Sequence, residues 1–374
     1  MENGSTFMGY PSTFASVVEN QTAAQPQYAE TPSPEAYLVP VVFAAIFGIG
    51  VAGNGTLIYT VFRHKSMRNT PNIFLVSLAA GDLLLIIVSV PFTSTIYTFH
   101  QWPYGLVICK LNEFLQALSL GVSVFTLTAL GAERYVAIAY PMKHTNPSMV
   151  RTLLAVGAIW CVSAILASLE AVAARIQHHD YGVIKLVICD IHPPEWGDAY
   201  KKFHAMYRFL VYFTLPIIVI ATFYLLMARI LLLSSSRLPA EGRTQGQAFR
   251  QMETRKKVAK VVLSFVAIFI VCWLPRHTYL LWFHFDPGLY NMFWHVFKIV
   301  GFCLSFINSC VNPFTLYILS SRFRHYYNRY LFCCCTHKRS YRRPRKTSHS
   351  AMCTFDSVSR GVNSHCTSTA YEMN

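Results

Sequence analysis

The chain has 374 residues, of which 53% are hydrophobic and only 13% are charged, and its mean hydropathy is +0.36. Soluble domains carry about 25% charged residues, so this composition excludes an ordinary water-soluble fold and indicates a membrane protein. The formal net charge of +15 does not indicate a nucleic-acid partner, because no basic folded surface is visible in the sequence.

Seven weakly charged stretches follow one another, and each is long enough to cross about 30 Å of hydrocarbon as a helix. Buried helices of soluble proteins rarely reach such lengths. We therefore predict an all-α membrane protein that folds as a seven-transmembrane helix bundle. The expected spans are residues 37–62, 72–99, 108–137, 152–174, 204–233, 257–284 and 292–319.

Basic residues gather on one side of the expected bundle, which sets its orientation in the plasma membrane. Residues 1–36 contain no Lys or Arg, whereas the segment after the fifth span and the C-terminal tail are rich in both. The N-terminus is therefore expected to be extracellular, with sequons for glycosylation at Asn3 and Asn20, and the basic inner face is expected to contact anionic membrane lipids. We predict disordered tails at 1–36 and 336–374 on either side of a bundle at 37–320.

An amphipathic segment follows the last span. In residues 321–332 the apolar and aromatic side chains share one helical face, a pattern typical of a helix that lies along the membrane surface. Three adjacent cysteines come next, suited to S-palmitoylation: Cys333, Cys334 and Cys335. Residues 321–335 are therefore predicted to form an amphipathic eighth helix with a lipid anchor. A metal site at these cysteines is less favoured, because His337 is the only further ligand nearby.

Polar side chains lie within several spans, although a carboxylate at the bilayer centre costs about 2.5–3.5 kcal/mol. Asp82 is the only aspartate inside a span, and we expect it to be the metal ligand of the chain. The candidate polar core, able to hold water or a sodium ion, comprises Asn54, Asp82, Ser123, Asn308, Ser309 and Asn312. The alternative is a set of interhelical hydrogen bonds without an ion. No other cofactor is required.

Cys109 and Cys189 are the only cysteines predicted outside the bilayer on the extracellular side. Because that side is oxidising, we expect them to form a disulfide, and two free thiols are the alternative. Four prolines lie deep within spans: Pro91, Pro216, Pro275 and Pro313. Each removes a backbone hydrogen bond and loosens its helix, which favours a bundle that moves over a rigid anchor.

The sequence offers little support for an enzyme or a transporter. An intramembrane enzyme would need a catalytic set, such as paired aspartates or a His-Glu-x-x-His motif, and the spans contain neither. A transporter would usually show internal repeats and symmetric pairs of broken helices, which are also not found. We expect a non-enzymatic protein and keep a transporter as a distant alternative.

Four short motifs occur along the spans in a fixed order. LAAGD (78–82) lies in the second span, ERY (133–135) ends the third, CWLP (272–275) lies in the sixth and NPFTLY (312–317) in the seventh. With these motifs the chain resembles the class A, or rhodopsin-like, G-protein-coupled receptors. The resemblance extends over about residues 37–335.

The finer resemblance is to peptide receptors. MRNTPNIFLVSLAAGDLLL (67–85) and GVSVFTLTALGAERYVAIAYPM (121–142) are similar to the bombesin/neuromedin B group, and its invertebrate relatives for CCHamide neuropeptides look nearest. The resemblance implies an extracellular peptide ligand and a heterotrimeric G protein, of the calcium-mobilising Gq type, as the inner partner. A receptor for another peptide, such as an endothelin-like one, is the alternative.

The resemblance also implies an activation switch. In the family, the arginine that matches Arg134 pairs at rest with the preceding acid, here Glu133, and turns toward the G protein on activation. The implied switch residues are Glu133, Arg134, Tyr135, Tyr224, Phe269, Trp273, Pro275, Asn312, Pro313 and Tyr317. Related receptors often restrain the arginine with an acid at the foot of the sixth span. This chain has Arg255 there, so we expect basal signalling.

Two positions argue against small ligands. Gln116 stands where amine receptors of the family carry an aspartate, and Phe306 stands where opsins carry the lysine that binds retinal. A polar mouth with charges of both signs suits the end of a peptide instead. The candidate contacts are Glu113, Gln116, Arg208, Arg276, His277, Tyr279 and Lys298, with Glu170 a weaker candidate.

The end of the chain is rich in serine and threonine. Phosphorylation there would create an anionic segment that binds arrestin, so receptor kinases and arrestin are expected partners. The alternative is a solvated tail without a partner.

Overall fold

The computed structural model describes residues 34–99, 101–140, 149–180, 185–235, 243–286 and 288–331. Several predicted features lie outside these ranges, among them the sequons at Asn3 and Asn20, the cysteines at 333–335, the tail 336–374 and residues 1–33 of the other tail. Residues 34–36, which were predicted to be disordered, are helical, because the first span begins at Pro34. All described residues belong to one compact unit.

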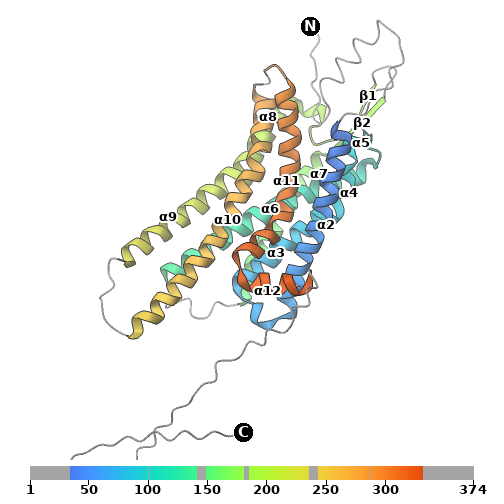
Figure 1. Ribbon diagram of the computed structural model, residues 1–374. Coiled ribbons are helices and arrows are strands. Elements are labelled where there is room, and N and C mark those ends of the chain that lie inside the picture. Colours follow the sequence, from blue (N-terminus) through green and yellow to red (C-terminus); the bar gives the residue numbers. More distant parts are fainter. Residues whose placement is uncertain are drawn as a thin grey trace, which may run out of the picture. The chain divides into compact units, whose positions relative to one another are not determined.

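Seven helical segments are long and apolar enough to cross a membrane, and they pack into the predicted bundle (Figure 1). Five of them are single helices: α2 (Pro34–Arg63), α6 (Gly105–Ala139), α7 (Met149–Ala173), α10 (Arg243–Phe285) and α11 (Met292–Leu319). The predicted bundle is therefore confirmed. α10 begins well before the predicted residue 257, because the polar residues ahead of the apolar stretch also form helix.

The other two spans change their helical pitch just ahead of a proline. The second consists of α3 (Thr70–Leu84), η2 (Leu85–Ser89) and α4 (Val90–Ser94), and the fifth of α8 (Gly197–Phe209), η4 (Leu210–Thr214) and α9 (Leu215–Ser235). Both middle pieces are π-helical turns. A proline ring crowds the carbonyl four residues earlier, and the wider turn relieves that clash at Pro91 and Pro216.

The second span ends earlier than the predicted residue 99. α4 stops at Ser94, and the Thr95 hydroxyl donates to the Phe92 carbonyl oxygen at 2.7 Å. A short helix, α5 (Ile96–Phe99), follows this turn. A threonine hydroxyl competes with the backbone N–H groups of the helix for a carbonyl oxygen. The pattern of apolar residues in the sequence does not reveal this competition.

A β-hairpin that was not predicted from the sequence covers one end of the bundle (Figure 1). β1 (Arg175–Asp180) pairs antiparallel with β2 (Lys185–Asp190). The predicted disulfide is confirmed: it joins Cys189 of β2 to Cys109 of α6, with the two Cα atoms 5.6 Å apart. The backbone N–H of Trp102 also donates to a carbonyl oxygen of β2 at 2.7 Å. The hairpin is thus fixed near the start of α6 at two points, and we call this the hairpin end.

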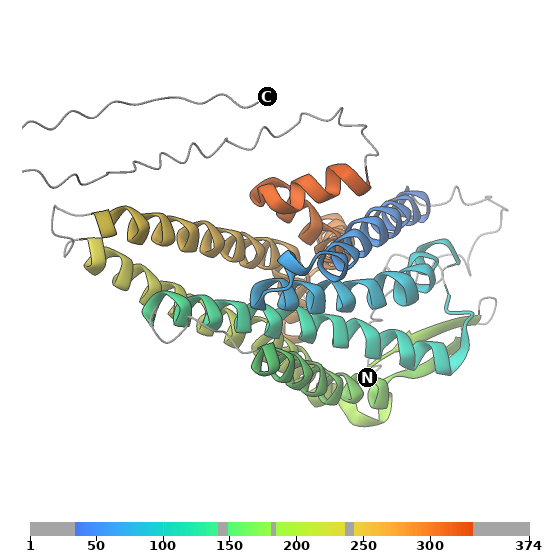
Figure 2. The same ribbon diagram turned by 90° about the horizontal axis from the view of Figure 1, so that it is seen from below.

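The opposite end, which we call the α12 end, carries the predicted amphipathic helix. α12 (Ser321–Tyr330) lies beside α2 (Figure 2). Its apolar face is buried through Phe323 and Tyr327, and the Tyr327 hydroxyl donates to the Gly53 carbonyl oxygen at 3.1 Å. Burial raises the pKa of the Tyr327 phenol, so this donor remains protonated. The helix is therefore held to the bundle by a specific hydrogen bond as well as by its apolar face.

Two glycines allow helices to touch at their prolines. A Cβ at Gly53 would lie 2.8 Å from ring atoms of Pro313. At Gly301, a Cβ would lie 3.0 Å from the Arg276 backbone nitrogen and 3.1 Å from the Pro275 carbonyl carbon. Backbone atoms cannot swing aside as the end of a flexible side chain can. α11 therefore meets the kink of α10 because residue 301 has no side chain.

Replacing Gly301 with alanine is expected to destabilise the protein by about 1–3 kcal/mol, because the added carbon overpacks the contact with α10. Gly48→Ala and Gly157→Ala are matched controls, since no atom lies within 4 Å of a Cβ at either position. Alanine favours a helix over glycine by about 1 kcal/mol, so the controls should be neutral or stabilised. Thermal unfolding in detergent measures the difference, and equal midpoints for all three variants would contradict the close contact.

Candidate functional site

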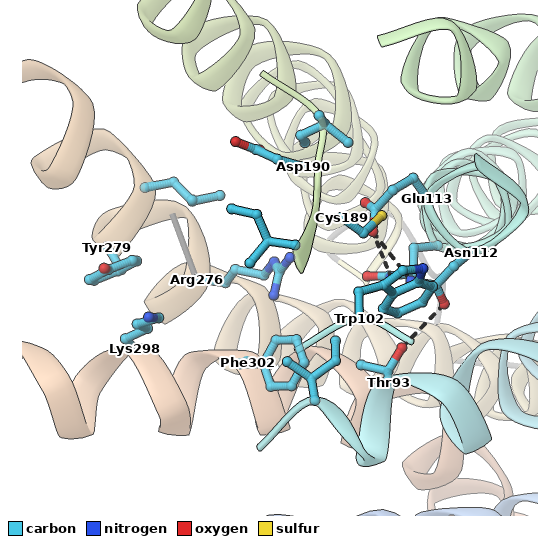
Figure 3. A pocket seen from close by; sticks show the side chains of 15 residues that line it. Thr93, Trp102, Asn112, Glu113, Cys189, Asp190, Arg276, Tyr279, Lys298 and Phe302 are labelled. Carbon is cyan, nitrogen blue, oxygen red and sulfur yellow. Dashed lines mark hydrogen bonds between the residues drawn. The ribbon is translucent and has the colours of Figure 1, made fainter. Parts of the chain in front are cut away.

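A cavity at the hairpin end encloses about 1100 Å³, including its open mouth (Figure 3). Its walls come from α4, α5, α6, α10 and α11, and β2 with the residues after it forms a further side. Within the described chain, α7, α8 and α9 contribute no lining residue. Five predicted contact residues meet in this hairpin-end pocket: Glu113, Gln116, Arg276, Tyr279 and Lys298.

The pocket carries charges of both signs on different walls. Glu113 projects from α6, whereas Arg276 and Lys298 project from α10 and α11 (Figure 3). Oε1 of Glu113 accepts hydrogen bonds from the side-chain amides of Asn112 at 3.2 Å and Gln116 at 3.5 Å. These two amides hold the Glu113 carboxyl group in a fixed orientation on the α6 wall of the pocket.

Two predicted contact residues lie elsewhere. Arg208 of α8 is buried, and its Nη1 lies 3.7 Å from Oε1 of Glu170. His277 is buried among rings, with centroids 5.1 Å from Phe213 and 6.0 Å from Trp273. Neither Arg208 nor His277 lines the pocket. The structure therefore associates both with the packing of the helices around the pocket.

Glu170 is the centre of a buried network between α7 and α8. Its side chain is nearly inaccessible, and Nε2 of His204 lies 2.9 Å from Oε2 and 3.1 Å from Oε1. The guanidinium group of Arg208 approaches the same carboxylate. The His192 ring centroid lies 5.0 Å from that of His204 and 5.3 Å from that of His284. One buried acid thus links two spans and the segment after the hairpin.

Asp190 lines the pocket but was not predicted. Its Oδ1 accepts from Nδ1 of His192 at 3.0 Å, and its Oδ2 accepts from Nε2 of Gln177 at 3.1 Å. The sequence did contain a signal, because Asp190 directly follows Cys189. A disulfide from Cys189 to the start of α6 brings its neighbours to the mouth of the bundle.

Aromatic rings lie below the pocket. Trp273 and Phe269 are buried on α10 with their ring centroids 6.1 Å apart, and Phe269 lies 6.3 Å from Phe213 of η4. Pro275 follows within the same helix. A shift of the Trp273 ring would therefore press on a second span and act close to the kink of its own helix.

The predicted polar core is buried throughout: Asn54, Asp82, Ser123, Asn308, Ser309 and Asn312. Nδ2 of Asn312 donates to Oδ2 of Asp82 at 2.8 Å, and Nδ2 of Asn54 donates to the Ser309 carbonyl oxygen at 2.8 Å. Oδ1 of Asp82 is buried with no partner in hydrogen-bond geometry among the described residues. A carboxylate oxygen in that state fits a cation, so these residues are compatible with sodium.

Arg134 is ion-paired with Glu133 near the α12 end of α6, the arrangement expected of the resting state. The Arg134 side chain is largely buried. An open cavity of about 450 Å³, a volume that includes its mouth, lies at the same end between α3, α6, α10, α11 and α12. The side chain of Arg255 lies outside the described residues, so the expectation of basal signalling stays a prediction.

The three switch tyrosines each contact another element. Tyr135 stacks on Phe223 of α9 with ring centroids 5.7 Å apart, and the Tyr224 hydroxyl donates to a carbonyl oxygen of α10 at 3.0 Å. Tyr317 meets Tyr327 of α12 edge to face at 6.4 Å. Since Tyr224 is bonded to α10, an outward movement of α10 would release its hydroxyl.

The comparisons with known proteins agree with this architecture. Residues 53–317 match the family model described as 7 transmembrane receptor (rhodopsin family). The chain is 45% identical over 355 residues to the neuropeptide CCHamide-1 receptor of Drosophila melanogaster. The aligned region covers 92% of this chain and 69% of that relative. The chain is 38% identical over 329 residues to bombesin receptor subtype-3 of Ovis aries, covering 86% of this chain and 82% of that relative.

Proposed function

Because the chain belongs to the rhodopsin family of seven-transmembrane receptors, we propose that it binds an extracellular neuropeptide of the CCHamide or bombesin type and activates a G protein inside the cell. It is a multi-pass receptor of the plasma membrane and not an enzyme. In this proposal the hairpin end faces outward and the α12 end faces the cytoplasm.

The hairpin-end pocket carries the proposal. It is wide, and Gln116 lines it where an amine receptor would present an aspartate. Its wall is largely apolar and carries a few polar, acidic and basic side chains. Such a wall suits the amide groups and charges at the end of a peptide. Two relatives named for CCHamide-1 and bombesin support the same class of ligand.

The route from the pocket to the G protein follows the buried residues of α10. A ligand in the pocket would displace Trp273 and Phe269, and α10 would then pivot at Pro275. Its inner end would move away from α6, which opens the cavity at the α12 end. Such a hinge turns a small shift at the ligand into a large one at the partner.

A sodium ion at Asp82 belongs to this proposal as a regulator of the resting state. Oδ1 of Asp82 would hold the ion, and buried hydroxyl and amide groups such as those of Ser123 and Asn308 would supply neutral oxygens. A bound cation would compensate the carboxylate charge inside the membrane.

Further partners follow from the segments beside the bundle. We infer coupling to the calcium-mobilising Gq type, arrestin and receptor kinases at the phosphorylated tail, palmitate at Cys333, Cys334 and Cys335, and glycans at Asn3 and Asn20.

Nucleotide exchange on a G protein in isolated membranes tests the proposed function. Membranes that contain this receptor are exposed in turn to CCHamide-1, bombesin and an endothelin. We expect CCHamide-1 to raise exchange at the lowest concentration and bombesin at a higher one. A response to endothelin alone would support the alternative peptide class. No response to any peptide, with the receptor at the cell surface and a competent G protein present, would contradict the proposal.

A further inference from the structure

A chain of side-chain hydrogen bonds joins the second span to the α6 wall of the hairpin-end pocket (Figure 3). The Thr93 hydroxyl of α4 donates to Oδ1 of Asn112 at 3.2 Å, and Nδ2 of Asn112 donates to Oε1 of Glu113 at 3.2 Å. All three residues line the pocket, but Thr93 and Asn112 are buried and Glu113 is only partly buried. The chain therefore leads from the interior of the bundle to a group that a ligand can reach.

The side-chain amide of Asn112 can serve both of its neighbours in one orientation only. A carboxylate accepts hydrogen bonds and does not donate them, so the amide nitrogen must face Glu113 and the amide oxygen must face Thr93. The Thr93 hydroxyl suits that oxygen because it can donate. Without the hydroxyl, a buried oxygen would lose its partner, which is costly, and the amide would turn or move to find another donor. Thr93 thus determines how Asn112 meets Glu113.

A change of helical pitch precedes Thr93 in the second span. The π-helical turn η2 (Leu85–Ser89) is followed by Pro91, and Thr93 comes two residues later. A π-helical turn contains an extra residue, so it changes the face that the following residues present, and such turns are frequent at functional sites. The adjacent Ser94 does not line the pocket, and its hydroxyl donates to the Pro91 carbonyl oxygen of the same span at 2.9 Å. Of two neighbouring hydroxyls, only that of Thr93 is directed to α6.

Glu113 has one carboxyl oxygen that the protein does not use. Oε1 accepts from both Asn112 and Gln116, and no hydrogen bond from the described residues reaches Oε2. Arg208 and Arg276 act on the carboxyl group through space, but neither forms an ion pair with it in the described part of the chain. Oε2 is therefore open to a hydrogen-bond donor that enters the pocket.

We propose that Thr93 and Asn112 are positioning residues for ligand recognition. The Thr93 hydroxyl fixes the Asn112 amide, and that amide holds the Glu113 carboxyl group where Oε2 accepts an N–H group of the peptide. This inference rests on the proposed function, since it requires a peptide in the hairpin-end pocket. It makes the second span part of the specificity of the site through Glu113, without a direct bond from the Thr93 hydroxyl to the ligand.

Equilibrium binding of a labelled peptide to membranes that contain the intact receptor tests this arrangement. The probe is CCHamide-1, or bombesin if only bombesin activates the receptor. Glu113→Ala should raise the Kd by about 10- to 100-fold, and Thr93→Val or Asn112→Ala by about 2- to 10-fold. When combined with Glu113→Ala, either of the smaller changes should add less than about 2-fold, because the group that it positions is already absent. Thr93→Ser keeps a donor and should recover most of the affinity.

Ser94→Ala is the matched control, because it removes a hydroxyl from the same short helix outside the pocket wall. It should keep the wild-type Kd. An unchanged Kd in Glu113→Ala would overturn the inference even if the Thr93 and Asn112 variants failed to reach the cell surface. Losses that multiply in the double variants would also overturn it, because Thr93 would then act independently of Glu113, while the proposed function would stand. If the wild-type receptor binds neither peptide, the proposed function fails and the inference fails with it.

Discussion

Replacing Glu170 with leucine is expected to destabilise the receptor by about 3–5 kcal/mol, the usual cost of removing one partner from a buried ion pair. The carboxylate is buried between Arg208 and His204, at 3.7 Å from Nη1 and 2.9 Å from Nε2 respectively. Its loss leaves a buried guanidinium group without its ion-pair partner. We expect less receptor at the cell surface and a lower midpoint of thermal unfolding in detergent.

The double variant Glu170→Leu/Arg208→Met separates charge balance from simple loss of packing. Replacing both members of a buried pair with apolar residues is often neutral, so this variant should recover more than half of the lost stability. Glu195→Leu is the control, since Glu195 is exposed at the same end and surface changes alter stability by at most about 0.5 kcal/mol. A double variant as unstable as Glu170→Leu would contradict the proposed pairing.

This network shows where prediction from the sequence reaches its limit. Seven spans and the eighth helix were predictable, because the length of an apolar stretch and one amphipathic face each determine a helix locally. Glu170 and Arg208 lie in different spans, and nothing in their sequence separation indicates that they meet. The presence of an acid and a base in successive apolar spans was the available signal for such a pair. We instead predicted Arg208 as a ligand contact.

Local chemistry explains the other differences. The predicted second span was too long, because the Thr95 hydroxyl donates to a backbone carbonyl oxygen and the helix ends there. The hairpin was not predicted, because it depends on the disulfide between Cys189 and Cys109 rather than on a pattern of apolar residues. The pocket was predicted better. Glu113 and Gln116 lie one turn apart on α6, and Arg276 directly follows Pro275, so these candidates, which the family resemblance placed near the mouth of the bundle, line one pocket. Their contact with a ligand stays a prediction.

Replacing Arg134 with alanine is expected to abolish peptide-dependent nucleotide exchange while peptide binding at the hairpin end persists. Arg134 is a largely buried cation near the α12 end, and its ion-pair partner is the adjacent Glu133. In the receptor family the matching arginine contacts the G protein, so its loss removes a contact formed only in the active state. Arg151→Ala is the control, because Arg151 is exposed on α7. Unchanged exchange in Arg134→Ala at matched surface expression would contradict the switch.

The ion pair itself predicts an effect of the opposite sign. Glu133→Gln removes the charge that holds Arg134 and should raise exchange without peptide, since a shift of about 1–2 kcal/mol changes a two-state ratio by about 5- to 30-fold. The double variant then decides the order of events. If Glu133 acts only by restraining Arg134, Glu133→Gln/Arg134→Ala must behave like Arg134→Ala and show no raised basal exchange. Raised basal exchange in the double variant would mean that Glu133 restrains another element, and the switch would then lie outside this pair.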